Sequence, residues 1–131
     1  YLESLAFRLT VERASDEELR TVVGLKGAMD EELSKPQLDK RRFGELHLEF
    51  HERIVELSGN QVLLSSYQRL NLRASHMFRE MNDRSGLRRT QQEHAKIVEY
   101  LITRNPKGER FMARHLWRRL EFLNVAEGEP E

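Results

Sequence analysis

The apolar residues of this chain recur at the 3.6-residue period of an α-helix, and only a few turn signals interrupt the pattern. Seven glycines and three prolines in 131 residues fall mainly between the periodic stretches. A helix with one apolar stripe must bury that stripe against other helices. The sequence therefore predicts an all-α domain, built as an antiparallel bundle of about six helices.

The breaks in this pattern predict the helix boundaries. Ser15 and Glu18 form an S-x-x-E capping box, which opens a helix. Pro36 fits a first helical turn, and Gly59-Asn60 suits the left-handed end of a helix. The expected helices span residues 1–14, 15–33, 36–58, 61–81 and 87–104, and a polar loop is expected over 82–86. A sixth helix is expected to carry the apolar residues Phe111, Met112, Leu116, Leu120 and Leu123. Residues 127–131 form a polar tail.

Charge and residue usage exclude several classes of protein. Lys and Arg number 22, as do Asp and Glu, so the chain lacks the positive field that non-specific nucleic-acid binding requires. The absence of cysteine removes disulfides, thiolate zinc sites and cysteine nucleophiles. No apolar run approaches the ~20 residues of a membrane span, and no signal peptide opens the chain. We expect a cytoplasmic protein without membrane contact and, because the chain starts at Tyr1 in a helical pattern, a fragment of a longer polypeptide.

Four of the five histidines are predicted to face the core from three helices. His47 and His51 are four residues apart, which places both imidazoles on one helix face. His94 and His115 lie on the apolar stripes of two later helices. A single inward histidine is usually an ordinary core residue, but one divalent ion satisfies four buried imidazoles together. These four histidines are therefore the candidate metal ligands.

Two other residues are candidates for effector binding. His76 lies off the apolar stripe of the helix expected at 61–81. It is either a solvated surface histidine or, together with Arg73, part of the lining of a ligand cavity. The basic clusters at 40–42, 88–89 and 118–119 are typical of solvated faces.

No enzyme signature accompanies the histidines. The sequence contains no Gly-rich phosphate loop, no G-x-S-x-G elbow and no H-E-x-x-H motif. Glu49 lies between His47 and His51 but projects from another side of the helix. No Asp or Glu stands plainly on the buried stripe beside the histidines, although metal-dependent bundle enzymes usually recruit several carboxylates. We expect a protein that is not an enzyme, and a metal-dependent helical-bundle enzyme is the less favoured alternative.

Four short motifs, in order, resemble the FadR-type C-terminal domain, or FCD domain, of GntR-family bacterial transcription regulators. They are Leu5–Leu19 (LAFRLTVERASDEEL), Leu46–Asn60 (LHLEFHERIVELSGN), Glu93-His94 and Phe111–Leu116 (FMARHL). The resemblance covers nearly the whole chain, so residues 1–131 are expected to form one effector-binding and dimerisation domain.

The resemblance implies a bundle with a central ligand and metal cavity. Metal-binding members use an Asp and a His four residues apart plus two later histidines, and these positions fall on His47, His51, His94 and His115; here His47 replaces the Asp. The resemblance also implies Zn²⁺ or Ni²⁺ as the cofactor, a small organic acid as the effector, a homodimer, and operator DNA bound only through an N-terminal winged helix-turn-helix domain outside this chain. A metal-free FCD domain that binds an apolar or acyl-CoA-like effector is the alternative.

Overall fold

The computed structural model describes residues 2–70 and 84–116, which are helical apart from short connections. The complete helices are α1 (Leu2–Arg13), α2 (Asp16–Ser34), α3 (Lys40–Leu57) and α5 (Arg84–Ile102). Residues 61–70 and 108–116 are helical as well, and the described residues contain no strand. The all-α prediction with about six helices is confirmed. The expected continuation of the fourth helix to residue 81, and the positions of Leu120 and Leu123, lie outside the described residues.

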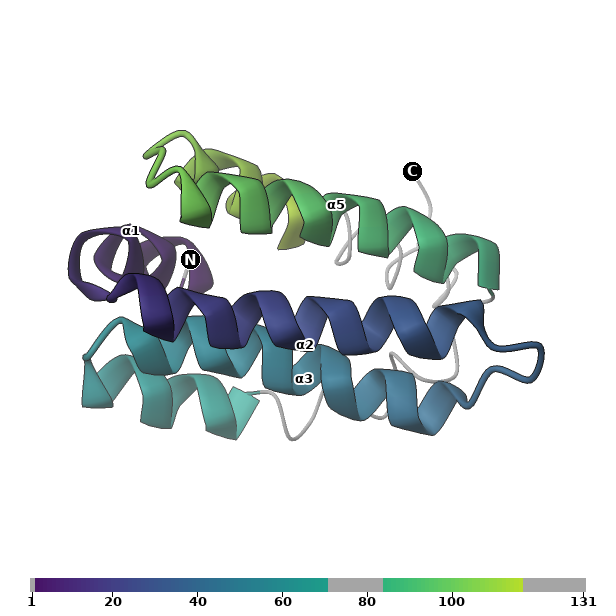
Figure 1. The fold of residues 1–131 in the computed structure, drawn as a ribbon. Coiled ribbons are helices and arrows are strands. Elements are labelled where there is room, and N and C mark those ends of the chain that lie inside the picture. The colour runs from purple at the N-terminus through teal and green to yellow at the C-terminus, as the bar shows by residue number, and fades with distance from the viewer. Residues whose placement is uncertain (1, 71–83, 117–131) are drawn as a thin grey trace, which may run out of the picture.

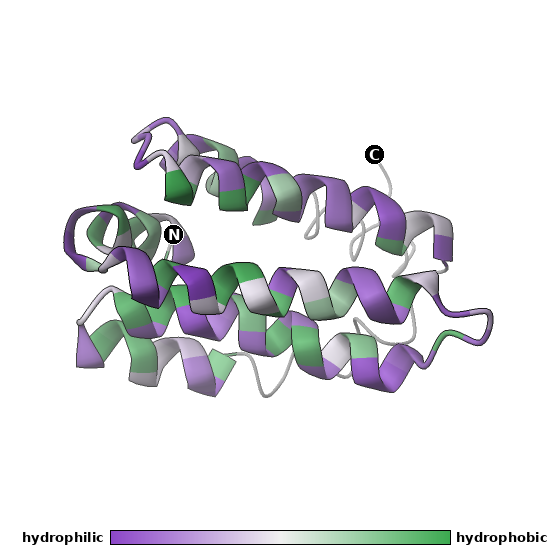
Figure 2. Cartoon of the chain, viewed as in Figure 1, coloured by the Kyte–Doolittle hydropathy of each residue, from purple (hydrophilic) through white to green (hydrophobic). Residues whose placement is uncertain are grey.

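The long helices run back and forth along one direction (Figure 1). α2 packs against both α3 and α5, while α1 contacts α3 and α5 at one end of the bundle. Hydrophobic and hydrophilic positions alternate around the helices at turn spacing (Figure 2), as expected for helices that bury one stripe each. None of the helices within residues 2–70 and 84–116 combines the length and apolarity that a membrane span requires.

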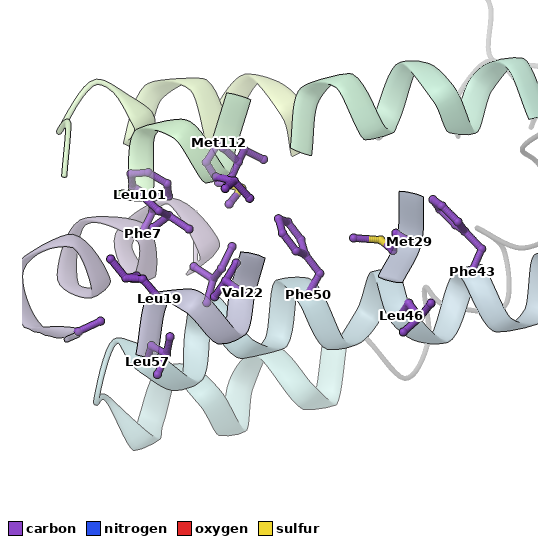
Figure 3. Close-up of a cluster of buried hydrophobic side chains, with 14 of the residues drawn as sticks. Phe7, Leu19, Val22, Met29, Phe43, Leu46, Phe50, Leu57, Leu101 and Met112 are labelled. Atoms are coloured by element: carbon purple, nitrogen blue, oxygen red, sulfur yellow. The ribbon is translucent and has the colours of Figure 1, made fainter. Parts of the chain in front are cut away.

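One apolar core joins the inner faces of these helices (Figure 3). Its most deeply buried members come from every complete helix and from the segment 108–116: Phe7, Val22, Met29, Phe43, Phe50, Ile54, Ile97, Leu101 and Met112. A smaller cluster of Ala6, Val55, Leu63 and Tyr67 ties α1 and α3 to the segment 61–70. The stripes predicted from the sequence are thus the faces that the tertiary structure buries.

Two predicted helix ends are confirmed in detail. The Ser15 hydroxyl accepts a hydrogen bond from the Glu18 amide at 3.1 Å, and the Glu18 carboxylate accepts one from the Ser15 amide at 2.9 Å, which completes the capping box. After α3, Gly59 adopts a left-handed conformation with φ of +73°. Asn60 does not share that conformation; its side chain caps the next helical segment by accepting from the Leu63 amide at 3.1 Å.

The predicted start of α3 was wrong. The helix begins at Lys40, not in the turn that contains Pro36, because Asp39 acts as its N-cap and accepts from the Arg42 amide at 3.1 Å. The Asp39 amide in turn donates to the buried Glu32 carboxylate at 3.2 Å. This connection back to α2 holds residues 35–39 outside the helix.

The boundaries of α5 also differ from the prediction. Arg84, Ser85 and Gly86, expected in a polar loop, belong to the first turn of α5. The Arg84 guanidinium donates to the backbone oxygens of Leu33 at 2.6 Å and Pro36 at 3.3 Å, contacts across the fold that local composition does not reveal. At its other end α5 stops at Ile102, two residues earlier than expected, and Arg104 is left-handed with φ of 53°.

Gly108 allows the segment 108–116 to approach α1 and α5 closely. A Cβ added at this position would overlap the Phe7 ring and lie 2.6 Å from the Tyr100 Cβ. We expect Gly108→Ala to lower the free energy of unfolding by about 1–3 kcal/mol, measured by urea denaturation. Gly24→Ala is the matched control, since nothing lies within 4 Å of its added Cβ, and it should stabilise α2 by about 0.5–1 kcal/mol. Equal stability of the two variants would contradict the close packing.

Candidate metal centre

The structure brings together the four histidines that the sequence singled out. His47 and His51 lie one turn apart on α3, His94 lies on α5, and His115 lies on the segment 108–116. Each is at most 3% exposed. One possible ligand atom from each side chain lies within 4.8 Å of the others, and the group is wholly composed of buried histidines. Three separate helical segments therefore converge on one polar point inside an apolar core.

Aromatic packing holds the imidazole rings against one another. The ring centroids of His47 and His94 are 4.9 Å apart, those of His51 and His94 are 5.0 Å apart, and those of His94 and His115 are 5.0 Å apart. The Phe50 ring extends from α3 into the space between α3 and α5 (Figure 3), with its centroid 4.6 Å from that of His94. This packing restricts the rotation of the rings.

Three of the imidazoles are oriented by side chains behind them. The Nδ1 atom of His51 lies 2.5 Å from Glu3 Oε1, and the Nδ1 atom of His115 lies 2.5 Å from Glu93 Oε1. The Nδ1 atom of His94 lies 3.0 Å from Gln91 Oε1. Each of these partners presents an oxygen, which accepts hydrogen bonds. The three Nδ1 atoms are therefore the donors, and a neutral imidazole at any of these positions carries its hydrogen on Nδ1.

Gln91 fixes the assignment at His94. Its side-chain nitrogen donates to the Lys26 backbone oxygen at 2.9 Å and to Asp30 Oδ1 at 2.8 Å, both on α2. Because both partners on α2 are acceptors, the side-chain nitrogen of Gln91 must face α2, and its side-chain oxygen then faces His94. The side chain of Gln91 thus links α2 to the imidazole of His94 on α5 and helps to orient that ring.

The Nε2 atoms of His51 and His94 face each other. With hydrogen on Nδ1, the Nε2 atoms of His51 and His94 present lone pairs across a distance of 3.2 Å. A proton on one of them or a cation bound to both removes this repulsion. A proton would satisfy that pair alone, but the Nε2 atom of His115 also lacks a hydrogen-bond partner among the described residues. A single divalent ion accommodates all these nitrogens, so the donor set fits a transition metal that prefers imidazole.

Burial keeps His115 neutral. Desolvation lowers the pKa of this imidazole below its usual value of 6.5, against the opposing effect of the hydrogen bond that it donates to Glu93. A neutral imidazole is the form that binds a metal ion. At neutral pH the site is thus ready to coordinate without first releasing a proton from His115.

Sequence reasoning missed the two carboxylates of the site. It found no acidic residue on the buried stripe beside the histidines, but the Glu3 and Glu93 side chains are only 8% and 16% exposed and both contact imidazoles. Each carboxylate contacts a histidine on a different helical segment from its own, so no i, i+4 spacing in the sequence indicates these carboxylate–histidine contacts. The available signals were weak: Glu93 directly precedes His94, and Glu3 lies in the first turn of a helix.

The remaining sequence candidates are not part of the described site. Arg73 and His76, the predicted effector-binding residues, lie outside the described residues, as do Arg118 and Arg119. Residues 40–42 and 88–89 are exposed, as expected for solvated faces.

A family model described as the FCD domain matches residues 1–118. A search of curated proteins finds no match to the chain.

The stability of the metal-free protein should fall when the pH drops below about 6.5. There the unfolded chain protonates residue 115 while the folded chain does not, so unfolding takes up a proton and the free energy of unfolding decreases. One such group contributes a slope of up to about 1.4 kcal/mol per pH unit. Urea unfolding between pH 7.5 and 5.0 in the presence of a chelator measures the slope. His115→Gln, which cannot titrate, should show a shallower slope, and an unchanged one would contradict the assignment.

Proposed function

The chain belongs to the FCD-domain family, and from this premise we propose that it is the effector-binding and dimerisation domain of a GntR-type transcription regulator. The domain comprises residues 1–131 and binds a divalent transition metal, Zn²⁺ or Ni²⁺, together with a small carboxylate metabolite. DNA binding belongs to an N-terminal winged helix-turn-helix domain outside this chain. The role is regulatory, not enzymatic.

One observation carries the metal-binding part of the proposal. Four buried histidines from α3, α5 and the segment 108–116 place a ligand atom each within 4.8 Å of the others. Their burial in an apolar core is costly unless the polar nitrogens are satisfied. His47, His51, His94 and His115 are the residues that would hold the ion through their ring nitrogens.

A bound ion supplies a positive charge and open coordination positions for the carboxylate oxygens of an effector. The protein's own contribution is to keep the imidazoles neutral and oriented, and to exclude water from the core around them. Because the ligands lie on α3, α5 and the segment 108–116, an effector that prefers one arrangement of these helices shifts the domain toward it. In a homodimer that change would alter the spacing of two DNA-binding domains.

We assign Arg73 and His76 to the effector site. A guanidinium and an imidazole suit recognition of a carboxylate, through charge-assisted hydrogen bonds. This assignment rests on residue chemistry and on the position of His76 off the apolar stripe of its helix.

The histidine cluster favours this function over a metal-free domain with an apolar effector. An apolar or acyl-CoA-like ligand gains nothing from four convergent imidazoles, and three side chains committed to orienting those rings would then have no evident purpose. The cluster also differs from a carboxylate-rich enzyme centre, because all four candidate ligands are histidines.

Metal content provides the first test. We expect the purified domain to carry about one equivalent of a divalent transition metal, measured by inductively coupled plasma mass spectrometry. His94→Ala and His115→Ala should both lose it, since each removes a ligand. His76→Ala is the control and should retain it. A wild-type domain that takes up neither Zn²⁺ nor Ni²⁺ would refute the metal centre.

Effector binding provides the second test. Small hydroxy- and keto-acids should raise the melting temperature of the metal-loaded domain, because a ligand that binds only the folded state stabilises it by about 2.7 kcal/mol at a hundredfold excess over Kd. The chelator-treated domain should not respond. Arg73→Ala and His76→Ala should weaken the response while leaving the metal content intact. An equal rise in melting temperature with and without metal would contradict binding of the effector through the ion.

A further inference from the structure

We propose that the domain carries a second ligand site, a basic pocket on its surface that binds a small phosphorylated organic molecule. The basic pocket is lined by residues from the first turn of α1, the end of α5 and the segment 106–114, and its volume is about 800 Å³. These parts of the chain lie at the same end of the bundle (Figure 1). None of the four candidate metal ligands lines the pocket, so this inference does not depend on the metal centre.

Three basic side chains line the pocket without a partner of their own. Lys107, Arg110 and Arg114 are exposed, and their side chains have no hydrogen bond or ion pair within residues 2–70 and 84–116. Their spacing of three and four residues places them on one helical face, where like charges repel one another. A bound anion relieves this repulsion. The planar forks of two guanidinium groups suit the oxygens of a phosphate group in particular.

The carboxylate of Glu109, which also lines the pocket, is already paired. Its Oε1 and Oε2 atoms accept hydrogen bonds from Nε and Nη2 of Arg8, each at 3.0 Å. Such a bidentate pair is the strong form of a charge-assisted contact. Glu109 therefore does not compete with a ligand for the three basic side chains, and the residues described at the pocket present a net positive charge.

A buried hydroxyl gives a second, independent indication of a ligand. Ser4 lines the pocket and is only 8% exposed, and its Oγ atom has no hydrogen-bond partner in the part of the chain that the structure describes. Ser4 lies in the first turn of α1, where no earlier carbonyl of the helix is present to accept from the hydroxyl. Burial of a hydroxyl without a partner is costly. A phosphate oxygen in the pocket supplies the missing acceptor.

The rest of the lining suits the organic part of a ligand. Tyr100, Pro106 and Ala113 present apolar surface beside the basic side chains. The Tyr100 ring is held by the Phe111 ring, at a centroid distance of 5.7 Å, and by close packing against Gly108. Sites for small molecules combine such fixed apolar walls with a few polar groups, in a volume of this order. The pocket thus fits a phosphate ester with an organic body.

The experiment titrates the purified domain with phenyl phosphate, which joins a phosphate group to an aromatic ring, in an isothermal titration calorimeter. We expect saturable binding. Ser4→Ala and Arg110→Ala should each weaken it about 10-fold, because each removes a hydrogen bond to a charged oxygen. Both variants should fold, since Arg110 is exposed and the Ser4 hydroxyl has no described partner to lose. Circular dichroism checks this.

Arg89→Ala is the matched control. Arg89 is an exposed arginine of α5 that does not line the pocket, so its removal changes the net charge by the same amount and should leave the affinity unchanged. Phenol lacks the phosphate group and should not bind. Inorganic phosphate lacks the ring and should bind more weakly than phenyl phosphate. The titration is repeated after treatment with a chelator and with the His94→Ala variant, and both should bind the probe as the untreated domain does.

The outcomes are distinct. The absence of saturable binding, wild-type affinity in both Ser4→Ala and Arg110→Ala, or an equal loss in Arg89→Ala overturns the second site. Binding that disappears with the chelator or in His94→Ala belongs to the metal centre and also overturns it. Equal affinities for inorganic phosphate and phenyl phosphate overturn the organic part of the ligand. Because a domain that holds no metal ion still binds the probe on this inference, the second site and the proposed metal centre fail separately.

Discussion

The convergence of four imidazoles inside an apolar core is the constraint on which the rest of this structure depends. Buried polar nitrogens without partners destabilise a fold, and His47, His51, His94 and His115 are all at most 3% exposed. Their hydrogen-bond requirements fix how α3, α5 and the segment 108–116 face one another. The Phe50 ring packs against the imidazoles of His51 and His94, with centroid distances of 5.2 Å and 4.6 Å.

The hydrogen-bond acceptors behind the rings determine which ring nitrogens face the centre of the cluster. Glu3, Gln91 and Glu93 occupy the Nδ1 atoms of three imidazoles, so the Nε2 atoms turn inward. In this way the first turn of α1 and, through Gln91, the backbone of α2 take part in orienting a site whose ligands lie elsewhere. A ligand or ion at the centre is thus coupled to nearly every helix of the described fold, which is the property that a sensing domain needs.

Much of the site was predictable because helical periodicity is local. The i, i+4 spacing of His47 and His51, and the apolar neighbours of His94 and His115, were enough to predict four inward imidazoles. The two carboxylates escaped prediction because Glu3 and Glu93 contact histidines 48 and 22 residues away in the chain. The predicted start of α5 was wrong for the same reason. Arg84 is held by hydrogen bonds to the backbone oxygens of Leu33 and Pro36, which are 51 and 48 residues away in the chain.

The sequence by itself determined the helical class, most helix ends and the identity of the candidate ligands, because apolar period and capping residues act within one or two turns. Only the tertiary structure decided which ring nitrogens converge and which side chains orient them. These properties depend on distances between residues far apart in the chain, and side-chain hydrogen bonds across helices leave no regular spacing in the sequence. The pattern therefore predicts a set of histidines, and the packing of the helices turns that set into a candidate metal centre.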